Sequence, residues 1–238
     1  MERNREALSY KILIEMKIAV LSTAIRLKNF FGLSKLTVPE DADGRKKVQV
    51  GSGAGRYGVA SASLLPGWLN TDLLSKFQID VSKRFNLPDS SVDIIFSSHV
   101  IEHLTQKQIR NFFKESSRVL RNGGLFICAT PDLEKITRLL YCSADAESRT
   151  IFIGRHSRGI SGQKATASRI LNHVMHINYG HKFLLDFETF EGFAQECKVF
   201  DIVREFQSTD CKELVGYFEA KPDIYQIETS IWVAKVAK

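Results

Sequence analysis

Residues 48–55 read VQVGSGAG, an apolar strand that runs directly into glycines at every second position. Because glycine has no Cβ, a loop of this kind lets the backbone turn sharply and approach a ligand closely. No GKS or GKT follows the glycines, which argues against the phosphate-binding loop of nucleoside triphosphatases. The stretch predicts a strand and a nucleotide-binding turn, although turns of other kinds also carry several glycines.

Short apolar runs alternate with helical patterns after this loop. The periodicity of apolar residues predicts helices over residues 106–121 and from Phe187 onward, the second capped by Asp186. Alternating strands and helices favour an α/β fold with a doubly wound, mainly parallel sheet. The predicted strands cover residues 48–50, 68–72, 77–80, 92–98 and 124–130, with further β-rich runs at 199–206 and 224–236.

Aspartates end the strands that follow the glycine loop. Asp72 ends the second predicted strand, and Asp80 ends the third. A carboxylate at the end of the second strand can accept hydrogen bonds from the hydroxyls of a ribose. At the end of the next strand, a carboxylate can meet an adenine amino group. Either aspartate alone is compatible with a simple turn, but their order after the glycine loop favours recognition of an adenosine group.

Longer motifs carry a resemblance to a known family. They read GWLNTD (67–72), LPDSSVDIIFSSHVIEHL (87–104), SSRVLRNGGLFICATPD (116–132) and GHKFLLDFETFEGF (180–193). The combination resembles the type 11 branch of class I S-adenosylmethionine-dependent methyltransferases. Within that branch it is most similar to predicted methyltransferases of bacterial surface-polysaccharide gene clusters. The resemblance covers roughly residues 48–236.

The resemblance implies a Rossmann-like methyltransferase domain over residues 39–238, with a seven-stranded sheet whose last strand is antiparallel. It also implies the cofactor S-adenosylmethionine, with Asp72 on the ribose and with Asp80 and Val81 around the adenine. Many relatives carry an acid where this chain has Gln49, a departure that bears on the affinity for the cofactor. The implied cofactor-binding residues are Gly51, Ser52, Gly53, Asp72, Asp80, Val81, Ser98 and His99.

Histidines supply the candidates for acid–base chemistry. His99, Glu102 and His103 match HxxEH, which binds zinc in one class of proteases when both imidazoles share a face of a continuous helix. Here the pattern directly follows a strand, so we expect His99 at a strand-to-helix turn and no metal. A hydroxyl acceptor benefits from a general base, and the pKa of histidine lies near neutrality. The candidate bases are His99, His103 and His181, with Glu102 in a capping or orienting role.

A second histidine group consists of His173, His176 and His181. We interpret it as histidines of a lid and of helix edges. A substrate-binding or base role for His181, and a metal site, are the alternatives. The surrounding residues 131–185 are poorly periodic and rich in polar residues, which is typical of a lid or substrate-binding region.

Residues 1–38 predict a helical extension, with Ile14, Ile18, Leu21, Ile25 and Phe30 on its apolar face. Charged residues interrupt the apolar stretch, so we expect neither a cleaved signal peptide nor a membrane span. The helix is expected to pack on its own domain or on a second subunit of a homodimer. Peripheral contact with the inner face of an anionic membrane is the alternative.

The charge and cysteine content bound the partners and the compartment. The chain has 238 residues and a net charge of +6, which suits a phosphorylated substrate, an anionic lipid or an ordinary enzyme. No RNA-recognition or zinc-finger pattern is present, so no nucleic acid partner is expected. The four cysteines show no CxxC spacing, which argues against a disulfide framework and favours a cytoplasmic setting.

The sequence therefore predicts a methyltransferase that uses S-adenosylmethionine. The resemblance points to O-methylation of a sugar or a glycan-lipid precursor in surface-polysaccharide biosynthesis. One alternative is a methyltransferase for another small metabolite, and another is a non-catalytic S-adenosylmethionine-binding partner subunit. A dinucleotide-binding Rossmann site is compatible with the glycine loop, but it expects GxGxxG at the start of a long helix.

Overall fold

The computed structural model describes residues 16, 20, 23–24, 36–53, 64–73, 75–142, 145–157, 160, 164–174 and 180–238. The predicted apolar face of Ile14, Ile18, Leu21, Ile25 and Phe30 lies outside these residues, as do residues 54–63 behind the glycine loop. Among the described helices, none combines the length and the hydrophobicity that crossing a bilayer requires.

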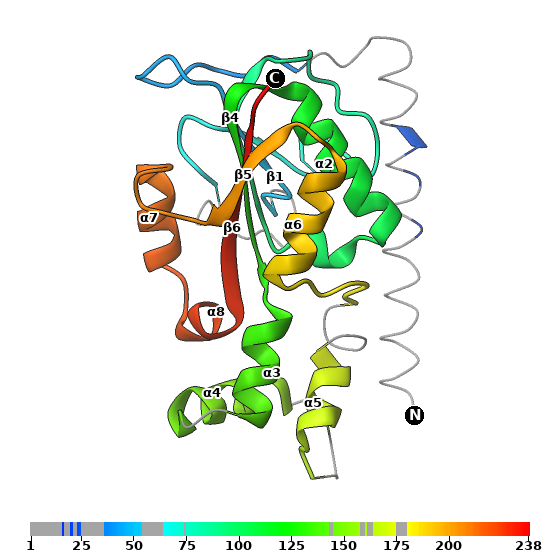
Figure 1. Cartoon of the computed structure of the whole chain (residues 1–238), viewed down its shortest axis with the longest axis vertical. Coiled ribbons are helices and arrows are strands. Elements are labelled where there is room, and N and C mark those ends of the chain that lie inside the picture. Colours follow the sequence, from blue (N-terminus) through cyan, green and yellow to red (C-terminus); the bar gives the residue numbers. More distant parts are fainter. Residues whose placement is uncertain are drawn as a thin grey trace.

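A mixed, six-stranded sheet in the order β2-β1-β3-β4-β6-β5 forms the centre of the described structure (Figure 1). Strands β1 to β4 pair in parallel, whereas β6 runs antiparallel to both β4 and β5. The antiparallel last strand confirms that part of the prediction. The strands are β1 (Lys47–Val50), β2 (Leu69–Thr71), β3 (Val92–Ser98), β4 (Leu120–Pro131), β5 (Phe200–Glu205) and β6 (Thr229–Val236).

Helices cover both faces of the sheet and one of its ends (Figure 1). On one face lie α2 (Gln106–Val119) and α6 (Phe187–Glu196), and on the other lies α7 (Lys212–Glu219). Since β4 runs directly into α3, the next helices extend beyond the carboxyl end of the parallel strands. These are α3 (Leu133–Tyr141), α4 (Ala146–His156) and α5 (Ala167–Asn172), with α8 (Asp223–Glu228) just before β6.

The alternation of side chains along the strands explains the layers. In β4, Phe126 belongs to the hydrophobic cluster under α2 and α6, whereas the next residue, Ile127, belongs to the cluster under α7. Phe126 packs edge-on against Phe113 of α2, with ring centroids 5.2 Å apart. Successive strand residues point to opposite faces, so a strand that is apolar throughout is buried on both sides. The result is a Rossmann-like α/β fold.

The predicted strand at residues 77–80 is wrong. Phe77 O accepts a hydrogen bond from Asp72 N at 3.1 Å, and Asp80 O accepts one from Lys83 N at 3.0 Å. Backbone groups that close turns in this way do not form a sheet ladder. The described part of the chain consequently has a six-stranded sheet rather than the seven strands expected.

The start of the β-rich run at 224–236 is also wrong, because residues 223–228 form α8. Ile224 and Ile227 lie three positions apart and both pack against the hydrophobic cluster of α3, α4 and α5. That spacing places them on one face of a helix. The cluster gives the region 131–185, predicted as a lid, a small core of its own. Its buried members are Ile136, Leu139, Leu140, Phe152, Ile170, Val174 and Leu184.

Candidate functional site

The glycine loop lies at the carboxyl end of β1, where the order of the strands changes direction. β2 pairs with one side of β1 and β3 with the other, so the carboxyl ends of β1 and β3 flank a switch point, where ligands bind in sheets of this kind. Gly51 follows β1 with a φ of 68°. A Cβ at this position would lie 2.3 Å from Cγ2 of Val100. Glycine is therefore required here, and the loop packs against the segment that follows β3.

Asp72 contacts the glycine loop. Its Oδ2 accepts a hydrogen bond from Gly53 N at 3.1 Å, and Ser52 N donates to Thr71 O at 2.9 Å. The Asp72 side chain is buried. An ionised carboxylate has about four acceptor sites, so it can hold the loop and also accept ribose hydroxyls. This donor and acceptor set fits an adenosyl group.

Asp80 and Val81 are held in a turn beside α2. Asp80 Oδ1 accepts hydrogen bonds from the backbone N and the Oγ of Ser82 at 2.9 and 2.7 Å. Asn111 of α2 donates to Val81 O at 3.3 Å, and Val81 packs against the hydrophobic cluster under α2 and α6. The turn is firmly positioned, and its contact with an adenine ring stays a prediction.

His99 follows β3 at the predicted strand-to-helix turn. Its φ of 53° is uncommon for a residue other than glycine, and a short 3₁₀ helix, Ile101–His103, comes next. Nδ1 of His99 lies 3.1 Å from Oε1 of Glu102, and Nε2 lies 3.1 Å from Oγ1 of Thr229. Both ring nitrogens thus have a partner, and Glu102 is positioned to orient the ring, the role predicted for it.

Glu102 and His99 shift each other's titration. Burial disfavours the charged form of His99, but the Glu102 carboxylate outweighs this effect and raises the pKa of His99 above its usual value. Glu102 is fully buried, at 0% exposure. Burial alone would raise the pKa of Glu102, yet the contact with His99 and the charge of His103 hold it below its ordinary value.

His103 and His181 meet although they lie far apart in the sequence. Their ring centroids are 5.0 Å apart in an edge-to-face arrangement. Lys182 N and Phe183 N both donate to Glu102 O, at 2.8 and 3.2 Å, which fixes the segment of His181 beside the 3₁₀ helix. Burial lowers the pKa of His181 to about 4, so its ring is neutral at physiological pH. The three candidate histidines therefore gather around Glu102.

The other histidines lie elsewhere. His173 is buried at the end of α5, and His156 Nε2 lies 2.9 Å from Oε2 of Glu228, a pair that joins α4 to α8. His176 lies outside the described residues. In the described part of the chain, the second histidine group is thus divided, with His181 beside His103 and His173 in the helical region.

Two residues near His99 were missed by the sequence reasoning. Tyr225 Oη lies 3.0 Å from Ser98 Oγ, and its ring centroid lies 4.9 Å from that of His99. Thr229 bonds His99 from the start of β6. Burial raises the pKa of Tyr225, so its hydroxyl stays protonated. No local pattern distinguishes this tyrosine from the other apolar residues of its run.

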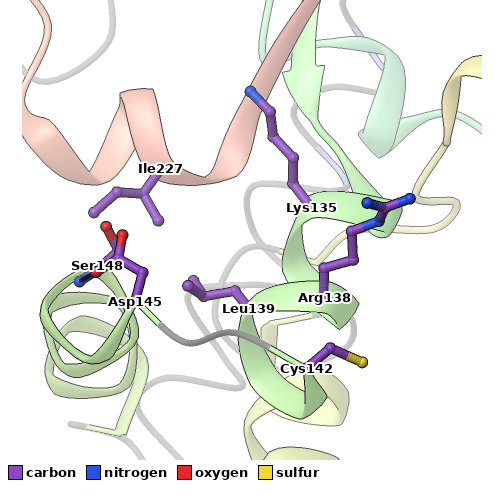
Figure 2. Close-up of a pocket in the computed structure, with 7 residues that line it drawn as sticks. All are labelled: Lys135, Arg138, Leu139, Cys142, Asp145, Ser148 and Ile227. Carbon is purple, nitrogen blue, oxygen red and sulfur yellow. Dashed lines mark hydrogen bonds between the residues drawn. The ribbon is translucent and has the colours of Figure 1, made fainter.

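An open pocket of about 560 Å³ lies between α3, α4 and α8 (Figure 2). Lys135 Nζ donates to Thr229 O at 2.8 Å, so the pocket and His99 share Thr229 as a neighbour. None of the site residues predicted from the sequence lines this pocket. It is lined by Lys135, Arg138, Leu139, Cys142, Asp145, Ser148 and Ile227.

Comparisons with known proteins bear on the segment that carries these residues. A protein-family model described as a methyltransferase domain matches residues 65–128. That segment includes Asp72, Asp80 and the HxxEH pattern of residues 99–103. Residues 65–128 are therefore similar in sequence to a methyltransferase domain.

Two curated relatives match a stretch of 46 residues. One, a probable S-adenosylmethionine-dependent methyltransferase of Mycolicibacterium smegmatis, is 48% identical over 19% of this chain and 17% of its own length. The other, a protein of the same description from Mycobacterium tuberculosis, is 46% identical over 19% of this chain and 16% of its own. The chain thus matches less than a fifth of either relative.

Among solved structures, a SAM-dependent methyltransferase from Archaeoglobus fulgidus aligns with 95% of this chain and 99% of its own. The identity is 15% and the TM-score 0.45. The matched family model is described as a methyltransferase domain, and both curated relatives are described as probable methyltransferases that depend on S-adenosylmethionine.

Proposed function

We propose that this protein transfers a methyl group from S-adenosylmethionine to a hydroxyl group of a sugar or a glycan-lipid precursor. One observation carries the methyltransferase activity: the glycine loop contacts Asp72 and Val100, the residue after His99, at the carboxyl ends of β1, β2 and β3, and residues 65–128 match a methyltransferase domain. The resemblance of the longer motifs to polysaccharide-associated methyltransferases supports the sugar or glycan acceptor.

In this proposal the chain contributes alignment rather than covalent chemistry. When bound, S-adenosylmethionine supplies a methyl group activated by its sulfonium, and the electrons of the broken C–S bond stay on sulfur. Gly51 allows the loop to lie against Val100, and Asp72 accepts hydrogen bonds from the ribose. Holding the acceptor oxygen in line with the methyl group accounts for much of the acceleration. Asp80 and Val81 frame the adenine, and Ser52, Gly53, Ser98 and His99 line the path of the ribose and methionine.

The acceptor lies against the histidines in this mechanism. Its oxygen forms the new O–C bond with a lone pair as its O–H bond breaks, and His99, His103 or His181 takes the proton. Glu102 and Thr229 restrict the ring of His99 to one orientation. A fixed ring loses less freedom on reaching the transition state than a mobile one.

Calorimetric titration with S-adenosylmethionine and S-adenosylhomocysteine tests the cofactor site. We expect binding to the wild type, and a loss of about tenfold or more in Asp72→Asn, because the amide group cannot replace both carboxylate oxygens. Asp201→Asn is the matched control, since Asp201 is exposed on β5 and should leave binding unchanged. If the wild type binds neither ligand, the proposed function fails. Equal binding by both variants would remove Asp72 from the site.

A screen with methyl-labelled cofactor tests the acceptor. Nucleotide sugars and lipid-linked sugars should take up label from the wild type and not from Asp72→Asn. Label in other small metabolites alone would keep the methyltransferase and discard the sugar acceptor. Cofactor binding with no acceptor labelled would favour the non-catalytic subunit.

A further inference from the structure

The cofactor site uses only His99 of the HxxEH pattern. In the folded chain, Glu102 and His103 of the pattern lie beside His181, which is not part of the pattern. In zinc proteases that carry this pattern, both histidines bind the ion from one helix face. Here both ring nitrogens of His99 face other partners, Glu102 and Thr229. The position beside Glu102 and His103 is taken by His181 instead.

We propose that Glu102, His103 and His181 form a binding site for a divalent transition-metal ion, with Zn²⁺ the first candidate, and that its open coordination position receives a hydroxyl of the methyl acceptor. The binding of the ion stands independently of the proposed function, whereas the role of the ion rests on it. The proposal departs from the sequence-based expectation that the protein has no metal site.

The distances suit an ion of this size. One ligand atom from each of the three side chains lies within 4.8 Å of the other two. Zinc bonds to imidazole nitrogen and carboxylate oxygen measure about 2.0–2.2 Å, which places tetrahedral ligands about 3.4 Å apart. The proposal requires the side chains to rotate until their ligand atoms reach that separation.

The scaffold around the three side chains is built from fixed elements. Glu102 and His103 lie on the 3₁₀ helix that follows β3. The segment of His181 is joined to that helix by the backbone hydrogen bonds of Lys182 and Phe183 to Glu102 O. Thr130 Oγ1, at the end of β4, donates to Oε2 of Glu102 at 3.3 Å. Such outer partners orient metal ligands in known sites.

Burial supports a cationic occupant. Glu102 has 0% exposure and His181 has 7%. A carboxylate removed entirely from water is costly unless a positive charge compensates it. His99 supplies part of this compensation at Oε1 of Glu102, and an ion bound between Glu102 and two imidazoles adds to it at the place where the ligand atoms converge.

The donor set selects the kind of metal. Two imidazole nitrogens and one carboxylate oxygen suit Zn²⁺, Fe²⁺, Mn²⁺ or Co²⁺, whereas Mg²⁺ and Ca²⁺ prefer oxygen ligands. Three protein ligands leave at least one coordination position for an exchangeable molecule. A hydroxyl bound there loses its proton more easily because the ion stabilises the negative oxygen. The bond changes remain those of methyl transfer: O–H and C–S bonds break, an O–C bond forms, and the electrons of the C–S bond stay on sulfur. The proton goes to His99 in this arrangement, because His103 and His181 are then ligands of the ion.

The first experiment titrates chelator-treated protein with ZnCl₂ in a calorimeter. We expect one equivalent to bind the wild type, with a loss of about a hundredfold or more in His181→Gln and His103→Gln, which each remove a ligand. His99→Gln is the discriminating variant. Because His99 is outside the proposed ligand set, we expect its affinity to fall by about tenfold at most, through the lost contact with Glu102.

The wild type alone gives a second measurement that needs no variant to fold. Bound Co²⁺ should show the intense visible absorption of four- or five-coordinate cobalt. Absence of one-to-one Zn²⁺ binding, or a greater loss in His99→Gln than in His181→Gln, would overturn the proposed site. S-adenosylhomocysteine binding in the same samples separates the two proposals. Cofactor binding without metal binding rejects only the metal site, and metal binding without cofactor binding rejects the proposed function.

Discussion

Gly51 is the residue at which the site tolerates the least change. A Cβ there meets Val100 at 2.3 Å, and the φ of 68° strains any other residue. We expect Gly51→Ala to destabilise the protein by roughly 2–4 kcal/mol, from about 1–2 for the left-handed backbone and the rest from the clash. The free energy of unfolding in urea measures the loss, and calorimetry should show weaker cofactor binding.

Gly123→Ala is the matched control for this substitution. Gly123 has a φ of 74°, but a Cβ there has nothing within 4 Å. It should therefore lose only about 1–2 kcal/mol, the cost of the backbone conformation alone. Equal losses in the two variants would mean that Val100 moves aside at little cost and that the loop is not fixed against β3.

At the same scale, contacts between successive strands follow from the predicted fold, whereas contacts across the chain do not. Gly53 and Asp72 meet because parallel strands in succession end at the same edge of a sheet. His181 reaches His103 through backbone hydrogen bonds to Glu102. Nothing in the local pattern around His181 encodes those bonds, so the sequence named both histidines without predicting that they meet.

Helix starts are element-scale features that the sequence predicted well, since a cap is a local interaction. Asp186 caps α6 by accepting a hydrogen bond from Thr189 N at 2.9 Å, as predicted. We expect Asp186→Ala to lower the free energy of unfolding by about 1 kcal/mol. Asp186→Asn keeps an acceptor oxygen and should lose about half of that or less. A loss in Asn as large as in Ala would assign the effect to charge rather than to the cap.

Strand prediction was less reliable at this scale, because a strand depends on partners. Residues 92–98 form β3 with the predicted bounds, since their apolar centre, residues 94–96, is buried on both faces of the sheet. Residues 77–80 carry similar apolar residues, yet their backbone closes turns with Asp72 and Lys83. Apolar character alone did not distinguish the two segments.

The helices α3, α4 and α5 form a group with its own core. Phe152 is fully buried in that core, with its ring 4.4 Å from the ring of His156. We expect Phe152→Ala to lower the free energy of unfolding of this helical group by about 3–5 kcal/mol. Hydrogen exchange should then quicken in α3 to α5 while the sheet stays protected.

Phe126→Ala is the control for the group. Phe126 is fully buried in the main cluster beneath α2 and α6. Phe126→Ala should quicken hydrogen exchange in the sheet and in α3 to α5 together. If Phe152→Ala also exposes β3 and β4 to the same extent, the helical group is not a separate cooperative unit.

At the scale of the whole molecule, an ion cluster around the buried Lys47 joins the first strand to the last third of the chain. Lys47 begins β1 and is 1% exposed, and its Nζ contacts the carboxylates of Asp41 and Glu213, the latter on α7. The hydrogen bond from Lys47 lowers the pKa of Asp41 to about 2. Burial raises the pKa of Glu213, but the ammonium of Lys47 outweighs it and brings the value to about 2.

These shifts predict a specific acid sensitivity. Unfolded carboxyls titrate near pH 4, so between about pH 4.5 and 2 the unfolded chain binds more protons than the folded one. The contribution of the cluster is therefore complete above that window and is lost as the pH falls through it. In urea unfolding, the wild-type free energy should decline over this range.

Lys47→Met removes the cation and keeps the length of the side chain. We expect the variant to be less stable by roughly 1–3 kcal/mol near neutral pH, because both carboxylates lose their nearest cation. The loss is smaller than for a fully buried pair, since water solvates the exposed Glu213. Its stability should also depend less on pH in the acid window, since the two carboxylates lose the cause of their low pKa values.

Lys46→Met is the control. Lys46 pairs at 3.4 Å with Glu40, which is exposed, and its loss should change stability by less than about 1 kcal/mol. If Lys47→Met retains the full acid sensitivity of the wild type, other carboxylates must cause it, and β1 and α7 are joined by packing alone.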